Sequence, residues 1–118
     1  MADEQFEPIQ QMIARAYNAI AQILGGLTPP IVIPRLGEGP GARTRSLEAI
    51  DRAHQIIGDL PISEDKTRMV RHTIVEWVTL YEMVATIEEA GATPLRVAAA
   101  SMAAHRLEIC FRHLRTLE

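Results

Sequence analysis

The sequence predicts an all-α protein, a four-helix bundle that forms a single domain over residues 1–118. Three observations predict this fold. Four segments carry apolar residues at three- and four-residue spacing, and glycine or proline interrupts the chain between them. The composition, with 47% hydrophobic and 23% charged residues, is typical of a globular chain. We expect helices at about 7–24, 45–58, 63–90 and 94–116, with a long Pro/Gly-rich loop, 26–43, between the first two.

The helix expected at 63–90 should form the centre of the bundle. Its apolar residues fill roughly half of the helix circumference, which is wider than the stripe of about 100° on an ordinary surface helix. That width predicts contact with two or more neighbouring elements. Ser63 is suited to cap the N-terminus of this helix, and Gly91 is suited to end it. Trp77 and Tyr81 are expected to be large anchors, either in the core or at an interface.

The first helix is expected to begin near Glu7, with Pro8 at its first position, where a missing N–H loses no helical hydrogen bond. Gly25 and Gly26 should end it. The loop that follows contains four of the seven prolines and four of the seven glycines, so we expect it to be irregular. Its apolar triplet, residues 31–33, is either a short extended segment or a lid that lies across the bundle.

The second and last helices also carry start and stop signals. Thr44 or Ser46 is expected to cap the second helix, and Gly58 follows its end. Thr93 and Pro94 are suited to the N-cap and the first position of the last helix. Apolar residues in the last helix keep a 3-4-3-4-3 spacing, which predicts a heptad-like seam against the bundle. The members of this seam are Ala100, Ala103, Leu107, Cys110, Leu114 and Leu117.

A second set of apolar residues lies outside these predicted core faces. Leu95, Met102 and Ile109 fall on the other side of the last helix, and Val75 and Met83 stand among polar neighbours in the central helix. One bundle core cannot easily bury both sides of a helix. We therefore expect either the long loop or a second subunit to cover these five residues, and we favour a homodimer because two-fold dimers are the commonest assembly. The alternative is a scattering of exposed apolar residues, which is normal for monomers.

Three arginines suggest an anion-binding site at the long loop. Arg35, Arg43 and Arg45 flank a glycine-rich stretch that precedes a helix N-terminus, where backbone N–H groups and the helix dipole favour anions. The segment 37–44, GEGPGART, approaches the phosphate-loop pattern but has Ala42 and Arg43 where that pattern needs glycine and lysine. No βαβ unit surrounds it, so nucleotide hydrolysis is not expected. The alternative is a solvated, flexible loop.

The segment around His54, Ala-His-Gln-Ile-Ile-Gly, resembles the Ala-His-x-Leu-Lys-Gly core of histidine phosphotransfer domains, which are also four-helix bundles. The resemblance covers six residues and implies that His54 would accept the phosphoryl group. Ile57 stands where that family has its lysine. The helical pattern also places His54 on the apolar side, whereas a phosphoacceptor must reach solvent. A packed or interface histidine is therefore the favoured interpretation.

Two His–carboxylate pairs occur at helical spacing, His72 with Glu76 and His105 with Glu108. Carboxylate-bridged metal sites in bundles use Glu-x-x-His with all ligands facing inward. Here the order is reversed and both pairs fall on polar arcs, so we expect solvated pairs and no metal site. The sequence offers no Ser/His/Asp arrangement and no CxxC or HExxH motif. We therefore expect no catalytic residues, no cofactor and no enzymatic activity.

Charge and cysteine content restrict the partners. The net charge of −3 gives no reason to expect a nucleic-acid partner. Arg106, Arg112 and Arg115 in the last helix could present a basic face to an acidic partner, and cations there also stabilise a helix C-terminus. Cys110 is the only cysteine and falls on the apolar side of its helix, so we expect a buried and unreactive thiol.

The chain shows no sign of secretion or membrane insertion. Its N-terminal stretch is acidic and does not resemble a signal peptide. The uncharged run 16–34 is interrupted by glycines, prolines and amide side chains, so we expect no membrane span. The cytoplasm is the simplest compartment for such a chain.

Together these patterns predict a non-enzymatic helical interaction protein, such as an adaptor, a chaperone-like subunit or a small regulator, that works through protein–protein contacts as a homodimer. The alternative is a regulator that binds an anion or small ligand through the arginines of the loop. A third possibility is a histidine phosphotransfer-like protein that uses His54.

Overall fold

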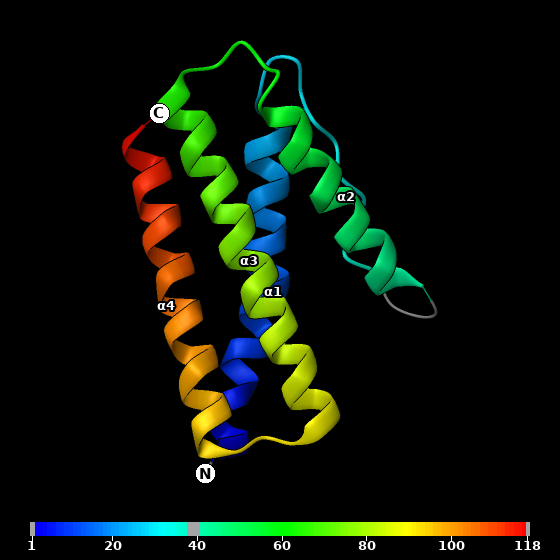
Figure 1. Ribbon diagram of the computed structural model, residues 1–118, viewed down its shortest axis with the longest axis vertical. Coiled ribbons are helices and arrows are strands. Elements are labelled where there is room, and N and C mark those ends of the chain that lie inside the picture. Colours follow the sequence, from blue (N-terminus) through cyan, green and yellow to red (C-terminus); the bar gives the residue numbers. More distant parts are fainter. Residues whose placement is uncertain (1, 38–40, 118) are drawn as a thin grey trace.

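A computed structural model describes residues 2–37 and 41–117 of the chain, which contain four α-helices and no strand (Figure 1). The helices are α1 (Ala2–Gly25), α2 (Ala42–Ile57), α3 (Glu64–Ala90) and α4 (Pro94–Thr116). Helices α1, α3 and α4 pack against one another, and α3 and α4 run antiparallel with the most extensive contact of any pair. Helix α2 packs chiefly on α3, on the side opposite α4. The helical bundle is thus three mutually packed helices with α2 added at one flank.

Trp77 lies at the centre of the core and is fully buried. Its indole Nε1–H donates a hydrogen bond to the backbone carbonyl of Ile13 in α1, over 3.1 Å. The Tyr17 ring packs against it at a tilt, 5.3 Å between centroids, and the Tyr81 ring stacks on it at 4.9 Å. The Tyr17 hydroxyl in turn donates to the backbone carbonyl of Pro34. We call Tyr17, Trp77 and Tyr81 the aromatic column, because they join α1, α3 and the long loop.

The expected ends of α3 and α4 are confirmed. The Ser63 hydroxyl accepts a hydrogen bond from the backbone N–H of Lys66, and the Thr93 hydroxyl accepts one from Arg96, each over 3.2 Å. These are N-caps of the standard kind, which satisfy helix N–H groups that lack an internal partner. Pro94 occupies the first turn of α4, and Gly91 ends α3 at a φ of 104°, a value that favours glycine.

The predicted start of the first helix, with Pro8 at its first position, is wrong. Helix α1 begins at Ala2, and Pro8 lies inside it. Proline there removes one helical hydrogen bond. The additional turn brings Phe6 into the core, where it continues the apolar pattern of Ile9 and Ile13. The burial of Phe6 offsets the lost hydrogen bond. The sequence pattern alone does not give the relative size of these two free energies.

The predicted caps of the second helix are also wrong. Helix α2 begins at Ala42, and its N-cap is Gly41, which has a φ of 76° and makes no side-chain cap hydrogen bond. Ser46, one of the two expected caps, is buried within the helix, and Thr44 lies in its first turn. Ala42 is buried in the first turn of α2, beside Gly37 of the loop, so the earlier start adds an apolar contact there.

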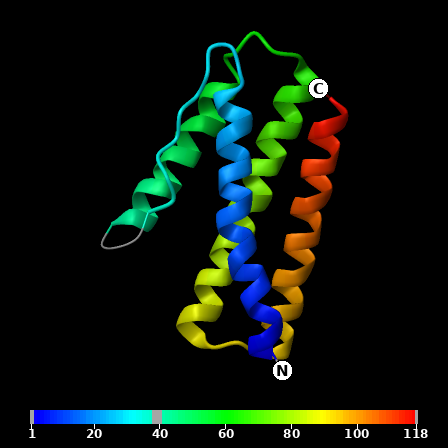
Figure 2. The ribbon, with the colours of Figure 1, turned by 180° about the vertical axis from the view of Figure 1, so that it is seen from behind.

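The described part of the long loop follows α1 and α2 and forms no strand (Figure 2). Ile31, Ile33 and Leu36 are half-buried and pack against the core, whereas Val32 between them is exposed. The Ile31 N–H donates to the carbonyl of Leu24 over 2.9 Å, which fixes the loop to the end of α1. The triplet thus follows the helices without forming a strand, with Ile31 and Ile33 packed against the core. Residues 38–40 of the expected loop lie outside the described residues.

Arg71 of α3 fastens the end of α2. Its Nε donates to the backbone carbonyl of His54 over 3.0 Å, and its Nη2 donates to that of Gln55 over 3.4 Å. These carbonyls belong to the last turn of α2, where helical partners are missing. A side chain at Gly58 would collide with the guanidinium, so glycine allows this close approach. The contact attaches an otherwise peripheral helix to the central one.

Replacing Arg71 with alanine is expected to lower the free energy of unfolding by about 1–2 kcal/mol, because two helix carbonyls lose a charged donor. The matched control is Arg68→Ala, one turn earlier in α3, where the arginine pairs only with the exposed carboxylates of Glu64 and Asp65. That change should cost less than about 0.5 kcal/mol. Denaturant unfolding followed by circular dichroism measures both. Equal losses for the two variants would contradict the role given to Arg71.

Candidate interaction surface

Five apolar residues of α3 and α4 are candidates for an interaction surface, and we call this set the outer face. Leu95 is 81% exposed, Met102 66%, Val75 50% and Ile109 39%, and Met83 is half-buried. Leu95, Met102 and Ile109 follow one another at seven-residue intervals, so they lie along one side of α4. Side chains of this size are normally buried when the fold offers a place for them.

This side of α4 does not pack in the core, because residues on the opposite side of the helix already fill the available space there. The seam residues from Ala100 to Leu114 are buried, together with Val97 and Ala104. Leu117 is the exception among the predicted seam, since it follows the end of α4 and is exposed. The alanines of the seam bring α4 close to its neighbours, so the larger side chains of α4 on the other side remain outside.

The described part of the loop does not cover the outer face. Its contacts, from Ile31 to Leu24 and from Pro34 to Tyr17, hold it against α1. In Figure 2 this segment runs beside α1 and α2, on the side of the molecule away from α4. The described part of the loop therefore does not cover these residues, which was one of the two expected arrangements.

Two arginines next to the outer face are engaged within the chain. Arg106 of α4 donates from Nε to Oε2 of Glu76 in α3 over 2.9 Å, and the Glu76 carboxylate is largely buried. Arg96 donates from Nη1 to the carbonyls of Ala90 and Gly91, over 3.1 and 3.0 Å, at the connection between α3 and α4. It also borders a shallow hollow of about 340 Å³ beside Met83. These two arginines are therefore held within the chain, while Glu82 also lines the hollow and the exposed Arg112 lies one helical turn after Ile109.

The expectation that Glu76 forms a solvated pair with His72 is therefore wrong. His72 is exposed, whereas Glu76 turns toward α4 and pairs with Arg106. The other expected pair, His105 and Glu108, is exposed. Within residues 2–37 and 41–117, no three histidine, cysteine, aspartate or glutamate side chains come together in a way that could hold a metal ion.

The arginines of the expected anion site have different surroundings. All three are exposed, and Arg43 places its guanidinium over the Tyr81 ring, 5.3 Å from the centroid, as in a cation–π contact. Arg45 lies beside Gly41. Among the described residues, Arg35, Arg43 and Arg45 form no ion pair. Because residues 38–40 are not described, an anion site at this loop stays a prediction.

The single cysteine and His54 are both constrained by packing. Cys110 is buried in the seam, and burial raises the pKa of its thiol, while a hydrogen bond with the Thr73 side chain acts in the opposite direction. Since thiolates are the reactive form, this environment disfavours reaction at neutral pH. His54 is half-buried near the end of α2, where its carbonyl accepts the hydrogen bond from Arg71.

No protein-family model, curated protein or solved structure matches this chain. Function must therefore be argued from the geometry alone. Among the described helices, none combines the length and the hydropathy that crossing a bilayer would require.

The cross-helix pairing of Arg106 does not follow from the sequence pattern. The pattern places Arg106 with Arg112 and Arg115 on a basic face, but Arg106 points toward α3 and neutralises Glu76. The available signal was position: both residues border the apolar arc of their helix, where a long side chain can reach the neighbouring helix. A local pattern cannot say which helix that neighbour will be.

The free energy of unfolding is expected to fall as the pH rises above 9. Burial raises the folded-state pKa of Cys110 above 9.0 and those of Tyr17 and Tyr81 above 10.0. The folded protein then retains protons that the unfolded chain releases, so this stabilisation is complete below the unfolded pKa values and is lost above them. Denaturant unfolding at a series of pH values measures the fall, and Cys110→Ala should delay its onset. A stability that stays constant or increases through pH 10 would contradict these environments.

Proposed function

We propose that this protein is a non-enzymatic interaction protein that associates with a second copy of itself through the outer face. The observation that carries the proposal is the row of exposed side chains Leu95, Met102 and Ile109 on α4, whose opposite side is already buried. On α3, Val75 is 50% exposed, and Met83 is half-buried and packs partly against the core. An apolar surface built from two adjoining helices is typical of a protein–protein contact.

A second copy is the partner that this surface fits best. In a two-fold dimer the same patch meets itself, so uncompensated charges on it would face like charges. Two arginines bordering the outer face are already engaged, Arg106 in an ion pair with Glu76 and Arg96 with backbone carbonyls. In an apolar contact between two copies, these arginines would therefore not face each other as unpaired like charges.

Packing of the reactive side chains supports a non-enzymatic role. The Cys110 thiol is buried with a raised pKa, so it is poorly placed to act as a nucleophile. Glu76 is neutralised by Arg106, and His54 is half-buried at the end of α2. We therefore assign the chain to adaptors, chaperone-like subunits or small regulators, which act by presenting a surface to a partner.

Introducing a carboxylate into the outer face should separate the dimer. Ile109→Glu and Met102→Glu are each expected to weaken self-association by about tenfold or more, because a charge must then be buried without a partner. The matched control is Ile56→Glu in α2, since Ile56 is 44% exposed and Ile109 is 39% exposed. Sedimentation velocity measures association, and circular dichroism checks that helix content is kept.

The control variant and the unaltered protein should sediment alike as dimers, while the two outer-face variants sediment as monomers at the same concentration. If both outer-face variants remain dimeric, the contact lies on another surface. If Ile56→Glu separates the dimer equally well, the effect is one of general surface charge, and the outer face loses its assigned role.

A further inference from the structure

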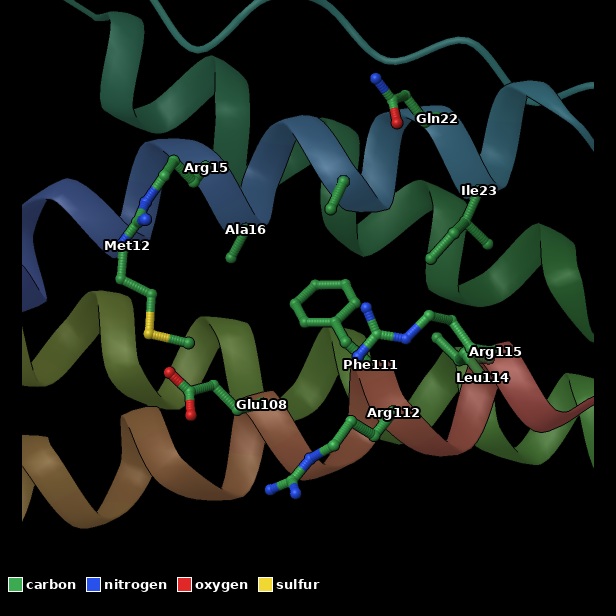
Figure 3. A pocket seen from close by; sticks show the side chains of 11 residues that line it. Met12, Arg15, Ala16, Gln22, Ile23, Glu108, Phe111, Arg112, Leu114 and Arg115 are labelled. Carbon is green, nitrogen blue, oxygen red and sulfur yellow. The ribbon is translucent and has the colours of Figure 1, made fainter.

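A second exposed surface lies between α1 and α4, away from the outer face (Figure 3). It is an open groove with a volume of about 670 Å³, which we call the α1–α4 groove. Helix α2 packs on the far side of α3 and the described loop runs over α1 and α2, so no described element covers this groove. Its floor is apolar and consists of Met12, Ala16, Ala19, Ile23, Phe111 and Leu114.

The floor has the form of a channel between two helices. Positions 12, 16, 19 and 23 follow one another at four- and three-residue spacing, so they face α4 along the length of α1. The Phe111 ring stands between the two helices in Figure 3. The segment of α1 that borders the groove is about 17 Å long, because a helix rises about 1.5 Å per residue. This length corresponds to about three turns of a docked helix.

The rim of the groove is basic. Arg15 borders it on α1, and Arg112 and Arg115 border it on α4, against the single acidic residue Glu108. Among the described residues these three arginines form no ion pair and no side-chain hydrogen bond. A chain with a net charge of −3 thus gathers unpaired positive charge around one apolar channel. Helix dipole stabilisation accounts for Arg115 near the end of α4 but not for Arg15 in the middle of α1.

We propose that the α1–α4 groove binds an acidic amphipathic helix of a partner protein. An amphipathic helix places its apolar stripe in a groove of this kind, through anchors three and four residues apart. Carboxylates on one flank of that helix would meet Arg15, and those on the other flank would meet Arg112 and Arg115. The groove is open along its length, whereas sites for small molecules enclose most of their ligand. An extended helical partner therefore fits better than a small anionic amphiphile.

Helix binding at the groove rests on the proposed function only because both treat the chain as an interaction protein. It does not depend on the dimer. The two surfaces use different residues, and α4 presents Leu95, Met102 and Ile109 away from the groove. A dimer can therefore bind such a helix, and so can a monomer. Failure of self-association and failure of helix binding are separate results.

The test uses two fluorescent helical peptides of about 18 residues, about five turns, with the same leucine stripe. One peptide has glutamates on both flanks of the stripe, and the other has lysines in their place. Fluorescence anisotropy with the full chain should show that the glutamate peptide binds about tenfold or more tightly than the lysine peptide, with an affinity that falls as salt is added.

Changes to the rim locate the binding site. The double variant Arg112→Glu, Arg115→Glu should weaken binding of the glutamate peptide by roughly tenfold or more, because attraction becomes repulsion. Arg15→Glu on the opposite helix should weaken it independently of any effect at the end of α4. The matched control is Arg52→Glu, an exposed arginine of α2 outside the groove, which should leave binding unchanged. Sedimentation velocity should show the rim variants self-associating as the unaltered protein does.

Three results would overturn the proposal. Equal binding of the two peptides would show that only apolar contact is at work. Unchanged binding by both rim variants would place the peptide elsewhere. Laurate serves as a probe for a small anionic amphiphile. If laurate binds and the glutamate peptide does not, the groove is a site for a small amphiphile. Peptide binding by a protein that sediments as a monomer would support the groove while refuting the dimer.

Discussion

The indole of Trp77 fixes the position of α3 against α1. It is fully buried and donates to the carbonyl of Ile13, so the register of the two helices is set by a directional contact as well as by apolar packing. Tyr17 and Tyr81 extend this contact, one to the loop through Pro34 and the other to α2 through Arg43. Loss of the indole would loosen every element that depends on this column, whereas α4 relies mainly on its own seam.

This arrangement determines which surfaces stay open. The aromatic column and Arg71 draw α2 and the described loop to one flank of the α1–α3 pair. Helix α4, on the other flank, has α3 and α1 as neighbours and nothing beyond them among the described residues. The outer face and the α1–α4 groove are the two exposed sides of this helix. Their chemistry differs, since the outer face has the Arg106–Glu76 ion pair at its border, whereas the arginines of the groove form no ion pair among the described residues.

Much of the fold could be predicted from the sequence because it follows from local chemistry. Ser63, Thr93 and Pro94 mark helix starts through hydrogen bonds and φ preferences within one turn of the chain. The start of α1 could not be predicted, because burial of Phe6 outweighs the local penalty at Pro8. The pairing of Glu76 with Arg106 and the groove at Arg15 depend on which helices become neighbours. Such information is tertiary and is absent from spacing along one helix.

The proposed dimer would cover apolar side chains that the fold leaves outside the core. Sedimentation equilibrium of the unaltered protein, up to tens of micromolar, tests whether this dimer forms. The mass in solution should approach twice the 13.1 kDa of one chain, with a monomer–dimer equilibrium at the lowest concentrations. A single species of 13.1 kDa over the whole range would contradict it.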